Sequence, residues 1–285
     1  MQLFQTESDA KSFAAALPTL HIGRVIDYRA RTGSTNDNAL QAARKGAPHG
    51  ALFISDVQDS GRGRRGRTWE SPPGLSLLFS VIVRPAQIRP EDVGWIPLVA
   101  GLACAEGIAE SSSLTPQIKW PNDVVIPASH APGWRKVGGI LCESVLSAAG
   151  GDSGHVVIGI GVNVNQQPAD LPELAKAPPT SIAIEQKSIA DRRAVLSAIL
   201  LRLESRCEEL GRAEWRAGLK AEVESRQRQW WPPRRMIQAE IPGGSGILRG
   251  EFAGLDDFGR LKLRDSSGKE HILADAEIIA AEQKS

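Results

Sequence analysis

Residues 51–83 read ALFISDVQDSGRGRRGRTWESPPGLSLLFSVIV, and this stretch sets the first part of the fold. It begins and ends with runs that are rich in branched and aromatic residues, ALFISDV and LSLLFSVIV, which predict two β-strands. Between these runs, Gly61, Gly63, Gly66 and the pair Pro72-Pro73 interrupt any strand ladder or helix. The connecting segment must therefore be a loop, and it carries four arginines.

The sequence on both sides of this stretch mixes helical and strand patterns. STNDNALQAARKG, which starts at Ser34, predicts a short helix with a hydroxyl cap and a stop at Gly46. The apolar spacing from Gly94 to Glu110 predicts a packed helix, and that from about Ala190 to Arg226 predicts one or two amphipathic helices. Strand-like runs lie between them at QIKW, DVVI, KVGGILCESVL and HVVIGIGVNVN. We therefore expect an α+β fold with a mixed β-sheet and flanking helices.

The pattern changes near the C-terminus. After Trp230 to Pro233 the chain reads as short strands separated by glycines, with hairpin turns expected at Asp257 to Gly259 and Ser266 to Gly268. This pattern is typical of a small all-β barrel. We expect two domains, a larger one over residues 1–231 and a β-domain over residues 232–285.

Composition excludes several classes of protein. The 285 residues include 34 basic and 33 acidic side chains, so a formal charge of +1 provides no global attraction to nucleic acid or to an anionic membrane. No uninterrupted apolar run is long enough for a membrane helix, and the N-terminus lacks the layout of a signal peptide. Three widely separated cysteines fit neither a disulfide framework nor a metal site. We expect a cytoplasmic protein with no membrane and no nucleic-acid partner.

The arginine loop is the first candidate site. Arg62, Arg64, Arg65 and Arg67 alternate with glycines that allow a ligand to approach the backbone closely. A guanidinium donates hydrogen bonds in a planar fork that matches carboxylate and phosphate groups. The composition therefore indicates a ligand with several anionic groups. The alternatives are a solvated basic turn and a nucleic-acid patch.

Two lysines extend this cationic site. Lys119 is the first residue of KWPND, which ends at Asp123. Lys136 lies 17 positions after Lys119 and is followed by Gly138 and Gly139. A lone lysine at a strand end is usually a solubilising charge. If these lysines and the loop arginines converge, however, they repel one another unless an anion neutralises them. This repulsion favours a polyanionic ligand.

A third candidate is GIGVNVN over residues 159–165. Glycine inside a strand often marks a place where a bulge forms or a flat ligand lies against the backbone. The amide of Asn163 can donate to and accept from a purine edge. The alternative is an ordinary asparagine in the turn that follows a strand.

Together these segments resemble the biotin protein ligases in motif, order and spacing. The resemblance covers Thr32 to Asn165 closely and the C-terminal barrel more loosely. Its motifs are TGSTNDNAL (32–40), DVQDSGRGRRGRTWESPPGLSLLFSVIVRP (56–85), IKWPNDVV (118–125), KVGGILCES (136–144) and VVIGIGVNVN (156–165). The family implies a class II synthetase-like catalytic domain followed by an SH3-like β-barrel.

The resemblance also implies an activity. Biotin and ATP, with Mg²⁺, would form biotinyl-5′-AMP, and biotin would then pass to a lysine of a biotin carboxyl carrier protein. Lys136, Arg64 and Asp123 would be the catalytic residues, with Asp123 orienting the incoming lysine. Biotin would be bound by Ser34, Thr35, Asn36, Gln58, Gly61, Arg62, Gly63, Arg64, Lys136 and Gly138. The nucleotide would be bound by Arg64, Arg67, Trp69, Lys119, Asn122, Lys136, Gly161 and Asn163. No residue is assigned to a metal.

The sequence departs from many bacterial members at two places. Only about 31 residues precede the first motif, too few for an operator-binding winged helix, so we expect no repressor activity. The segment between Asp123 and Lys136 includes IPASHAPGW, which predicts an extended surface loop. The rival functions are lipoate ligation, on a similar scaffold, and nucleic-acid binding through the arginine loop. A homodimer formed by an exposed strand near HVVIGIGV is a further expectation, with a monomer as the alternative.

Overall fold

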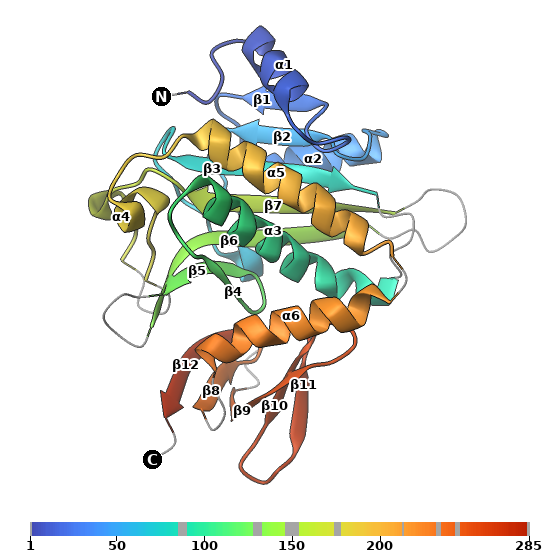
Figure 1. Cartoon of the computed structure of the whole chain (residues 1–285), viewed down its shortest axis with the longest axis vertical. Helices are drawn as coiled ribbons and strands as arrows, with labels where there is room; N and C mark the ends of the chain where they lie inside the picture. The colour runs from blue at the N-terminus through green and yellow to red at the C-terminus, as the bar shows by residue number, and fades with distance from the viewer. Residues whose placement is uncertain are drawn as a thin grey trace.

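The computed structural model describes residues 2–84, 90–127, 133–145, 154–173, 178–212, 214–231, 235–242 and 246–283. Two sheets organise these residues (Figure 1). A mixed seven-stranded sheet forms the centre of the molecule, and a five-stranded antiparallel sheet lies below it in the view of Figure 1. The α+β fold class is therefore confirmed.

The large sheet has the strand order β1-β2-β3-β7-β6-β5-β4. Among the described strands, β1 and β2 pair in parallel and all other neighbours are antiparallel. The strands are β1 Ile26–Arg29, β2 Leu52–Ser55, β3 Ser76–Val83, β4 Gln117–Lys119, β5 Asp123–Pro127, β6 Trp134–Val145 and β7 His155–Asn163. Six of them lie where sequence patterns predict strands, and β1 was not foreseen.

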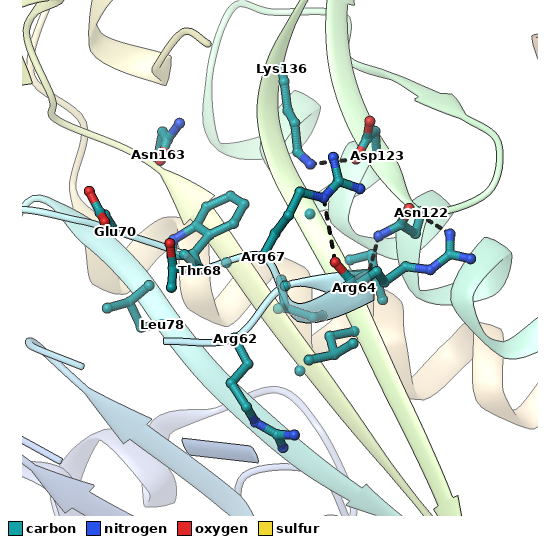
Figure 2. A pocket seen from close by; sticks show the side chains of 18 of the residues that line it. Arg62, Arg64, Arg67, Thr68, Glu70, Leu78, Asn122, Asp123, Lys136 and Asn163 are labelled. Carbon is teal, nitrogen blue, oxygen red and sulfur yellow. Dashed lines mark hydrogen bonds and ion pairs between the residues drawn. The ribbon is translucent and has the colours of Figure 1, made fainter. Parts of the chain in front are cut away.

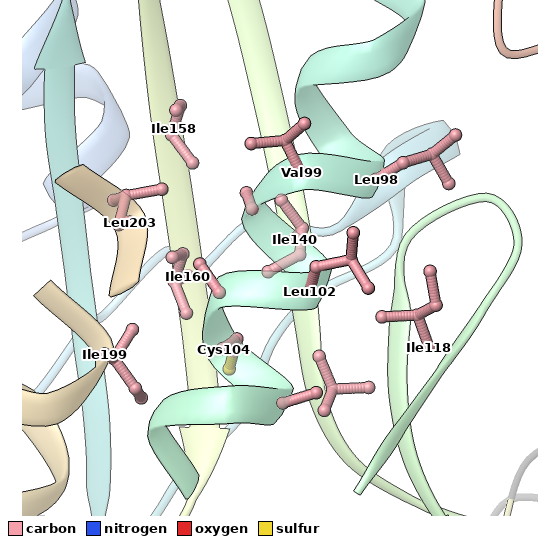
Figure 3. Packing of buried hydrophobic residues seen from close by; sticks show 14 of the residues in the cluster. Leu98, Val99, Leu102, Cys104, Ile118, Ile140, Ile158, Ile160, Ile199 and Leu203 are labelled. Carbon is pink, nitrogen blue, oxygen red and sulfur yellow. The ribbon is translucent and has the colours of Figure 1, made fainter. Parts of the chain in front are cut away.

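Alternation along the central strands separates the two faces of this sheet. Ile158 and Ile160 of β7 lie in the main hydrophobic core, beneath α3 (Ile96–Ser111) and α5 (Arg192–Glu209) (Figure 3). Val157, the residue before Ile158, points to the opposite face and packs with the alanines of α2 (Thr35–Arg44). Because successive side chains point to opposite faces, the same strand supports a dry core on one side and the α2 side on the other.

Helix α3 is apolar around most of its surface. With the preceding 3₁₀ turn η2 (Pro90–Trp95) it forms a segment, Glu91–Ser111, that is long and apolar enough by composition to cross a membrane. Of its apolar window, 72% is buried inside the fold, where α3 lies on the sheet beside α5 (Figure 1). Helices that are hydrophobic all round are typical of a protein core, so we assign this one to the core.

The remaining helices frame the sheet. They are α1 Glu7–Ala16, α4 Ile182–Gln186, α6 Trp215–Trp230 and the 3₁₀ turns η1 Arg64–Gly66 and η3 Pro168–Asp170. The N-terminal segment is fixed by Asp56, which accepts from Leu3 N at 3.1 Å, Tyr28 Oη at 2.5 Å and Arg192 Nη1 at 2.8 Å. Helix α1, which the sequence patterns did not predict, lies beside β1 (Figure 1). The stretch from Ala190 to Arg226 forms α5 and α6, two helices, as predicted.

The small sheet is SH3-like and has the order β11-β10-β9-β8-β12. Its strands are β8 Arg235–Glu240, β9 Ile247–Leu255, β10 Leu261–Arg264, β11 Glu270–Leu273 and β12 Glu277–Gln283. Both predicted hairpin turns are confirmed, with Gly259 N and Gly268 N donating to the carbonyls of Asp256 and Asp265. The predicted domain boundary at residue 232 lies outside the described residues and stays a prediction.

One expectation about surface strands is wrong. The strand HVVIGIGV was expected to be an exposed edge that could pair with a second copy, but β7 lies between β3 and β6 in the middle of the sheet. Its apolar residues are buried, because β3 and β6 occupy both of its edges. Within the described part of the chain, the edges of this sheet are β1 and β4.

Candidate active site

A pocket opens on the α2 face of the large sheet, where β7 carries glycines instead of large side chains. Gly159, Gly161 and Asn163 alternate with the core residues of this strand and therefore face the pocket. A Cβ at Gly159 would lie 2.0 Å from Asn36 Oδ1, and one at Gly161 would lie 2.7 Å from the Trp69 ring. Only glycine permits such close packing of α2 and the arginine loop on the strand.

The arginine loop folds back on itself above this glycine face. Gly63 N donates to Arg67 O at 2.7 Å, and Trp69 N donates to Gly61 O at 2.9 Å. Between these bonds, η1 forms one 3₁₀ turn in which Arg65 has a left-handed φ of 58°. The loop predicted from its glycines is therefore confirmed, and its own backbone bonds give it a defined shape.

Trp69 ends the loop inside the pocket. Its ring lies over Gly161 and approaches Gly139, and Lys136 Nζ is 5.7 Å from the ring centroid. Trp69 Nε1 is buried and has no hydrogen-bond partner among the described residues. A buried donor without a partner costs free energy, so a ligand acceptor at this position would be stabilised.

Lys136 and Asp123 form an ion pair inside the pocket, 2.5 Å from Nζ to Oδ1 (Figure 2). Lys119 Nζ lies 3.9 Å from the same carboxylate. Burial raises the pKa of Asp123, but the charges of Lys136 and Lys119 outweigh it and hold this pKa below its ordinary value. Burial lowers the pKa of Lys119. Asp123 is therefore an anion at neutral pH, with two cations beside it.

A β-bulge explains why Lys136 and Gly139 share the pocket although their spacing is odd. The register between β5 and β6 pairs Val124 with Gly138 but Val125 with Lys136, so one residue is extra. The prediction that Gly138 lines the site is not supported by its position, because its neighbour Gly139 lines the pocket instead. A Cβ at Gly138 would lie 3.0 Å from the carbonyl of Gly161.

The start of α2 forms a polar end to the pocket. Ser34 caps the helix, and Thr35 donates through both N and Oγ1 to Gln58 Oε1 at 2.7 and 3.0 Å. Ser80 Oγ, buried on β3, lies 2.8 Å from Thr35 Oγ1 and 2.5 Å from Asn36 Oδ1. These hydroxyl and amide groups can bind a neutral polar ligand group that both donates and accepts.

Arg62 points away from the other loop arginines (Figure 2). Its guanidinium binds Glu143 Oε1 and Oε2 at 3.1 and 2.5 Å, and Asp37 at 2.8 Å. Glu143 also accepts from Asn36 Nδ2 at 2.9 Å. Arg62 and Asn36 both line the pocket, as predicted, but both side chains bind the same protein carboxylate, that of Glu143.

The two asparagines predicted to face the nucleotide also line the pocket. Asn122 donates to Ile140 O at 2.7 Å and accepts from Arg64 Nη1 at 3.0 Å. Asn163 donates to Thr180 O at 2.9 Å and accepts from Gln166 Nε2 at 3.0 Å. Their amides are thus oriented by the protein, and Asn122 holds the Arg64 side chain.

The C-terminal sheet contributes acidic residues that the sequence reasoning missed. Asp275 pairs with Arg64 and Arg65, and Glu277 lines the pocket with its carboxylate 2.9 Å from Arg67 Nη1. Repulsion among the cations is therefore a weaker argument for a polyanionic ligand than the sequence indicated, because protein carboxylates already neutralise part of the charge. Sequence spacing offers no signal for this contact, since more than 200 residues separate the partners.

Most of the predicted site residues converge on this one pocket. Those that line it are Ser34, Thr35, Asn36, Gln58, Arg62, Gly63, Arg64, Arg67, Trp69, Lys119, Asn122, Asp123, Lys136, Gly161 and Asn163. Gly61 and Gly138 lie behind the lining. Residues that were not assigned to the site include Thr68, Glu70, Leu78, Leu171, Pro179 and Glu277. Among the described residues, no group of three or more His, Cys, Asp or Glu could hold a metal ion.

Comparison with known proteins agrees with this geometry. The sequence model of the Biotin/lipoate A/B protein ligase family matches residues 28–163, and that of the biotin protein ligase C-terminal domain matches residues 235–278. A biotin--[acetyl-CoA-carboxylase] ligase of Mycobacterium tuberculosis is 32% identical over 261 residues, which are 90% of this chain and 89% of that protein. A bifunctional ligase/repressor of Bacillus subtilis is 37% identical over 190 residues, 67% of this chain but 56% of the relative.

A solved structure of a biotin protein ligase has the same fold. The biotin protein ligase from Aquifex aeolicus, in complex with biotin and ATP, superposes with a TM-score of 0.72 and 25% identity. The match covers 92% of this chain and 100% of that one. Fold and site therefore define a ligase domain of the biotin and lipoate type, in which a mixed sheet carries a cation-lined pocket.

Within this class, the C-terminal domain match and the identity to a full-length relative decide the family. The chain belongs to the biotin protein ligases. It spans nearly the whole of the ligase from Mycobacterium tuberculosis and just over half of the ligase/repressor from Bacillus subtilis.

Proposed function

We propose that this chain is an ATP-dependent biotin protein ligase, which forms biotinyl-5′-AMP and then transfers biotin to a lysine of a biotin carboxyl carrier protein. The observation that carries the proposal is the convergence of five separated motifs on one pocket, with cations at one end and the polar start of α2 at the other. Relatives named biotin--[acetyl-CoA-carboxylase] ligase support a carboxylase subunit as the acceptor. Three free cysteines fit a cytoplasmic location.

The polar end suits the head group of biotin. A ureido group has two N–H donors and one carbonyl acceptor, which match the hydroxyls of Ser34 and Thr35 and the amide of Gln58. The valerate carboxylate would then extend along the glycine face of β7 towards Lys136. This orientation places the reacting carboxylate beside the cations of the loop.

In the first half-reaction, a carboxylate oxygen attacks the α-phosphorus of ATP and pyrophosphate leaves. Such a displacement depends mainly on position and on neutralisation of phosphoryl charge. Arg64, Arg67 and Lys136 would supply that charge, and Trp69 would pack against the adenine when the loop covers it. A closed loop would also keep water from the mixed anhydride.

In the second half-reaction, the amine of the acceptor lysine attacks the acyl carbon, an amide forms and AMP leaves. The incoming group arrives as an ammonium and must lose protons as the amide forms. Asp123 is an anion at neutral pH because Lys136 and Lys119 hold its pKa low. We assign it the task of orienting this amine through a hydrogen bond.

Mg²⁺ would accompany ATP. The described residues offer no cluster of metal ligands, and Asp123 and Glu277 are already paired with cations. Mg²⁺ on a triphosphate commonly keeps several waters and takes few protein ligands, which is compatible with this pocket. Its contribution would be to neutralise phosphate charge, and no residue here is assigned to it.

Mass spectrometry tests the proposal directly. The purified chain is incubated with biotin and ATP under non-denaturing conditions, and we expect biotinyl-5′-AMP to remain bound. Biotin-dependent exchange of labelled pyrophosphate into ATP is the matching kinetic assay. Neither retained adenylate nor exchange, from a folded protein, would reject the proposal.

Lipoate ligation is the second candidate, because the matching family contains both kinds of ligase. Labelling of a carrier domain with biotin and with lipoate, measured side by side, separates the two. We expect labelling with biotin. Labelling with lipoate alone would reverse the assignment.

A further inference from the structure

The arginine loop is attached to the C-terminal sheet by a set of ion pairs. Arg64 and Arg65 both contact Asp275, with 3.0 Å between Arg65 Nη2 and Asp275 Oδ1. Arg67 Nη1 lies 2.9 Å from Glu277 Oε1, and Arg65 Nη1 lies 3.8 Å from Glu277 Oε2. Three arginines of the loop therefore share two carboxylates, one on β12 and one in the turn that precedes it.

The two carboxylates lie at the start of β12, Glu277 on the strand itself and Asp275 two residues before it. Glu277 is the first residue of β12, which pairs with β8, and its side chain is only 19% exposed. The next residue, Ile278, accepts a hydrogen bond from Lys119 Nζ at 3.2 Å. Lys119, another cation that lines the pocket, thus contacts the same short segment.

Carboxylates and phosphates use the same donors of a guanidinium, because both match its planar fork. Asp275 and Glu277 therefore occupy N–H groups of Arg64 and Arg67 that phosphate oxygens would need. They also place two negative charges beside the space that a polyphosphate would enter. Both effects oppose binding of a polyanion.

We propose that Asp275 and Glu277 are positioning residues that compete with the nucleotide for the loop arginines. They hold the guanidinium groups over the pocket before ATP binds, and they lower the affinity of the pocket for phosphate groups. The inference rests on the proposed function only in naming ATP as the polyanion. It gives the C-terminal domain a role in nucleotide affinity.

Removal of a carboxylate also removes an anchor of the loop, and loss of the anchor opposes tighter ATP binding. The loop, however, keeps its internal bonds from Gly63 N to Arg67 O and from Trp69 N to Gly61 O. Arg64 also keeps its bond to Asn122 Oδ1 at 3.0 Å. Loss of one carboxylate therefore leaves the loop folded. The relief of competition then determines that ATP affinity rises.

The test uses the full chain with Asp275→Asn or Glu277→Gln, which preserve size and remove charge. The matched control is Glu270→Gln on the same sheet, where the carboxylate pairs with Arg264 at 2.6 Å and does not line the pocket. ATP affinity is measured by titration calorimetry, and KM for ATP and for biotin by pyrophosphate exchange. Melting temperatures show whether each variant is folded.

We expect ATP to bind about 3–10-fold more tightly to both site variants, a modest change because the ion pairs are partly exposed. KM for ATP should fall by a similar factor while KM for biotin stays within about twofold, and Glu270→Gln should match the wild type. Higher salt should narrow the difference, because it screens the charges. Unchanged or weaker ATP binding in folded variants would overturn the inference.

The calorimetric result does not depend on catalysis. If the wild type binds ATP but shows no biotin-dependent exchange, the proposed function fails while the competition is still measured. If the wild type exchanges pyrophosphate and neither variant gains affinity, the competition fails and the function stands. A purely structural role of the carboxylates would lower the melting temperature and shift both KM values together.

Discussion

At the scale of single residues, the pocket is a nearly balanced set of charges. Lys136 and Asp123 pair at 2.5 Å, Arg64 contacts Asn122 and Asp275, and Arg62 is held by Glu143. Each cation is oriented by a protein partner before any ligand arrives. Such preorganisation is what a phosphoryl-transfer site requires, because the donors need not reorganise during the reaction.

Arg64 is the first residue to test. Arg64→Ala removes a guanidinium that lines the pocket and is held by Asn122. We expect adenylate formation to slow by about 10²-fold or more, as for loss of one oxyanion donor. Biotin-dependent pyrophosphate exchange measures the rate, and an unchanged rate would remove Arg64 from the catalytic set.

Lys136→Met tests the electrostatics of Asp123. The wild-type pKa of Asp123 is below its ordinary value, so its contribution to stability is complete at neutral pH and is lost only as pH falls through that lowered pKa. The variant removes the main counter-charge and raises the pKa. We expect a loss of about 1–3 kcal/mol at pH 7, less than the about 3–5 kcal/mol of a fully buried pair, because Lys119 still lies 3.9 Å from the Asp123 carboxylate.

The pH dependence of this loss of stability tests whether it arises from the charge of Asp123. As pH falls from neutral towards 3.8, the ordinary carboxyl pKa, Asp123 of the variant takes up a proton before that of the wild type. The difference in free energy of unfolding should therefore narrow on acidification. Lys220→Met is the control, since Lys220 pairs at 3.0 Å with Asp257, which is 81% exposed, and should matter little. A pH-independent difference would contradict the assignment.

At the scale of elements, strand β7 makes the pocket possible by alternation. Its two isoleucines support the core under α3 and α5, and its glycines lie against Trp69 and Asn36. A strand with large residues on both faces would close the pocket and displace the arginine loop. The glycines are therefore required by the packing of neighbouring elements.

Gly161→Ala tests this packing. The new methyl group would lie 2.7 Å from the Trp69 ring, so the ring and the end of the loop must shift. Overpacking of this kind costs about 1–3 kcal/mol, and we expect the bound adenylate to be lost at least about tenfold faster. Gly218→Ala in α6, where a methyl group meets no atom within 4 Å, is the control. Equal adenylate retention in both variants would show that Trp69 does not need the glycine.

At the scale of the whole molecule, the two sheets share one interior. A single hydrophobic cluster includes Ile160 of the large sheet and Leu261 and Ile237 of the small one. Hydrogen bonds cross the joint from Trp95 Nε1 to Asp257 O at 2.9 Å and from Trp120 Nε1 to Gly259 O at 3.1 Å. The C-terminal sheet is therefore packed against the catalytic sheet and forms part of one core.

This shared core predicts cooperative unfolding. In differential scanning calorimetry we expect one transition, with a ratio of calorimetric to van't Hoff enthalpy near unity. The reason is that loss of the small sheet would expose the buried indoles of Trp95 and Trp120. Two separated transitions would show that the C-terminal sheet unfolds independently.

The sequence by itself determined the elements and the membership of the site. Periodicity and turn residues located the helices around Ser34 and Ile96 and most strands, because these signals are local. Composition located the arginine loop and Lys136 as candidate site residues, and the resemblance to the family supplied their roles and that of Asp123. Helix α1 and strand β1 were missed, since their patterns are weak without the contacts that stabilise them.

Only the tertiary structure decided which charges meet. The pairs of Asp275 and Glu277 with the arginine loop join residues more than 200 positions apart, and no spacing rule predicts such contacts. The bulge that turns Gly139 rather than Gly138 into the pocket, and the central place of β7, depend on strand pairing. Local sequence fixes what a segment can form, whereas packing against distant segments fixes which partners its side chains reach.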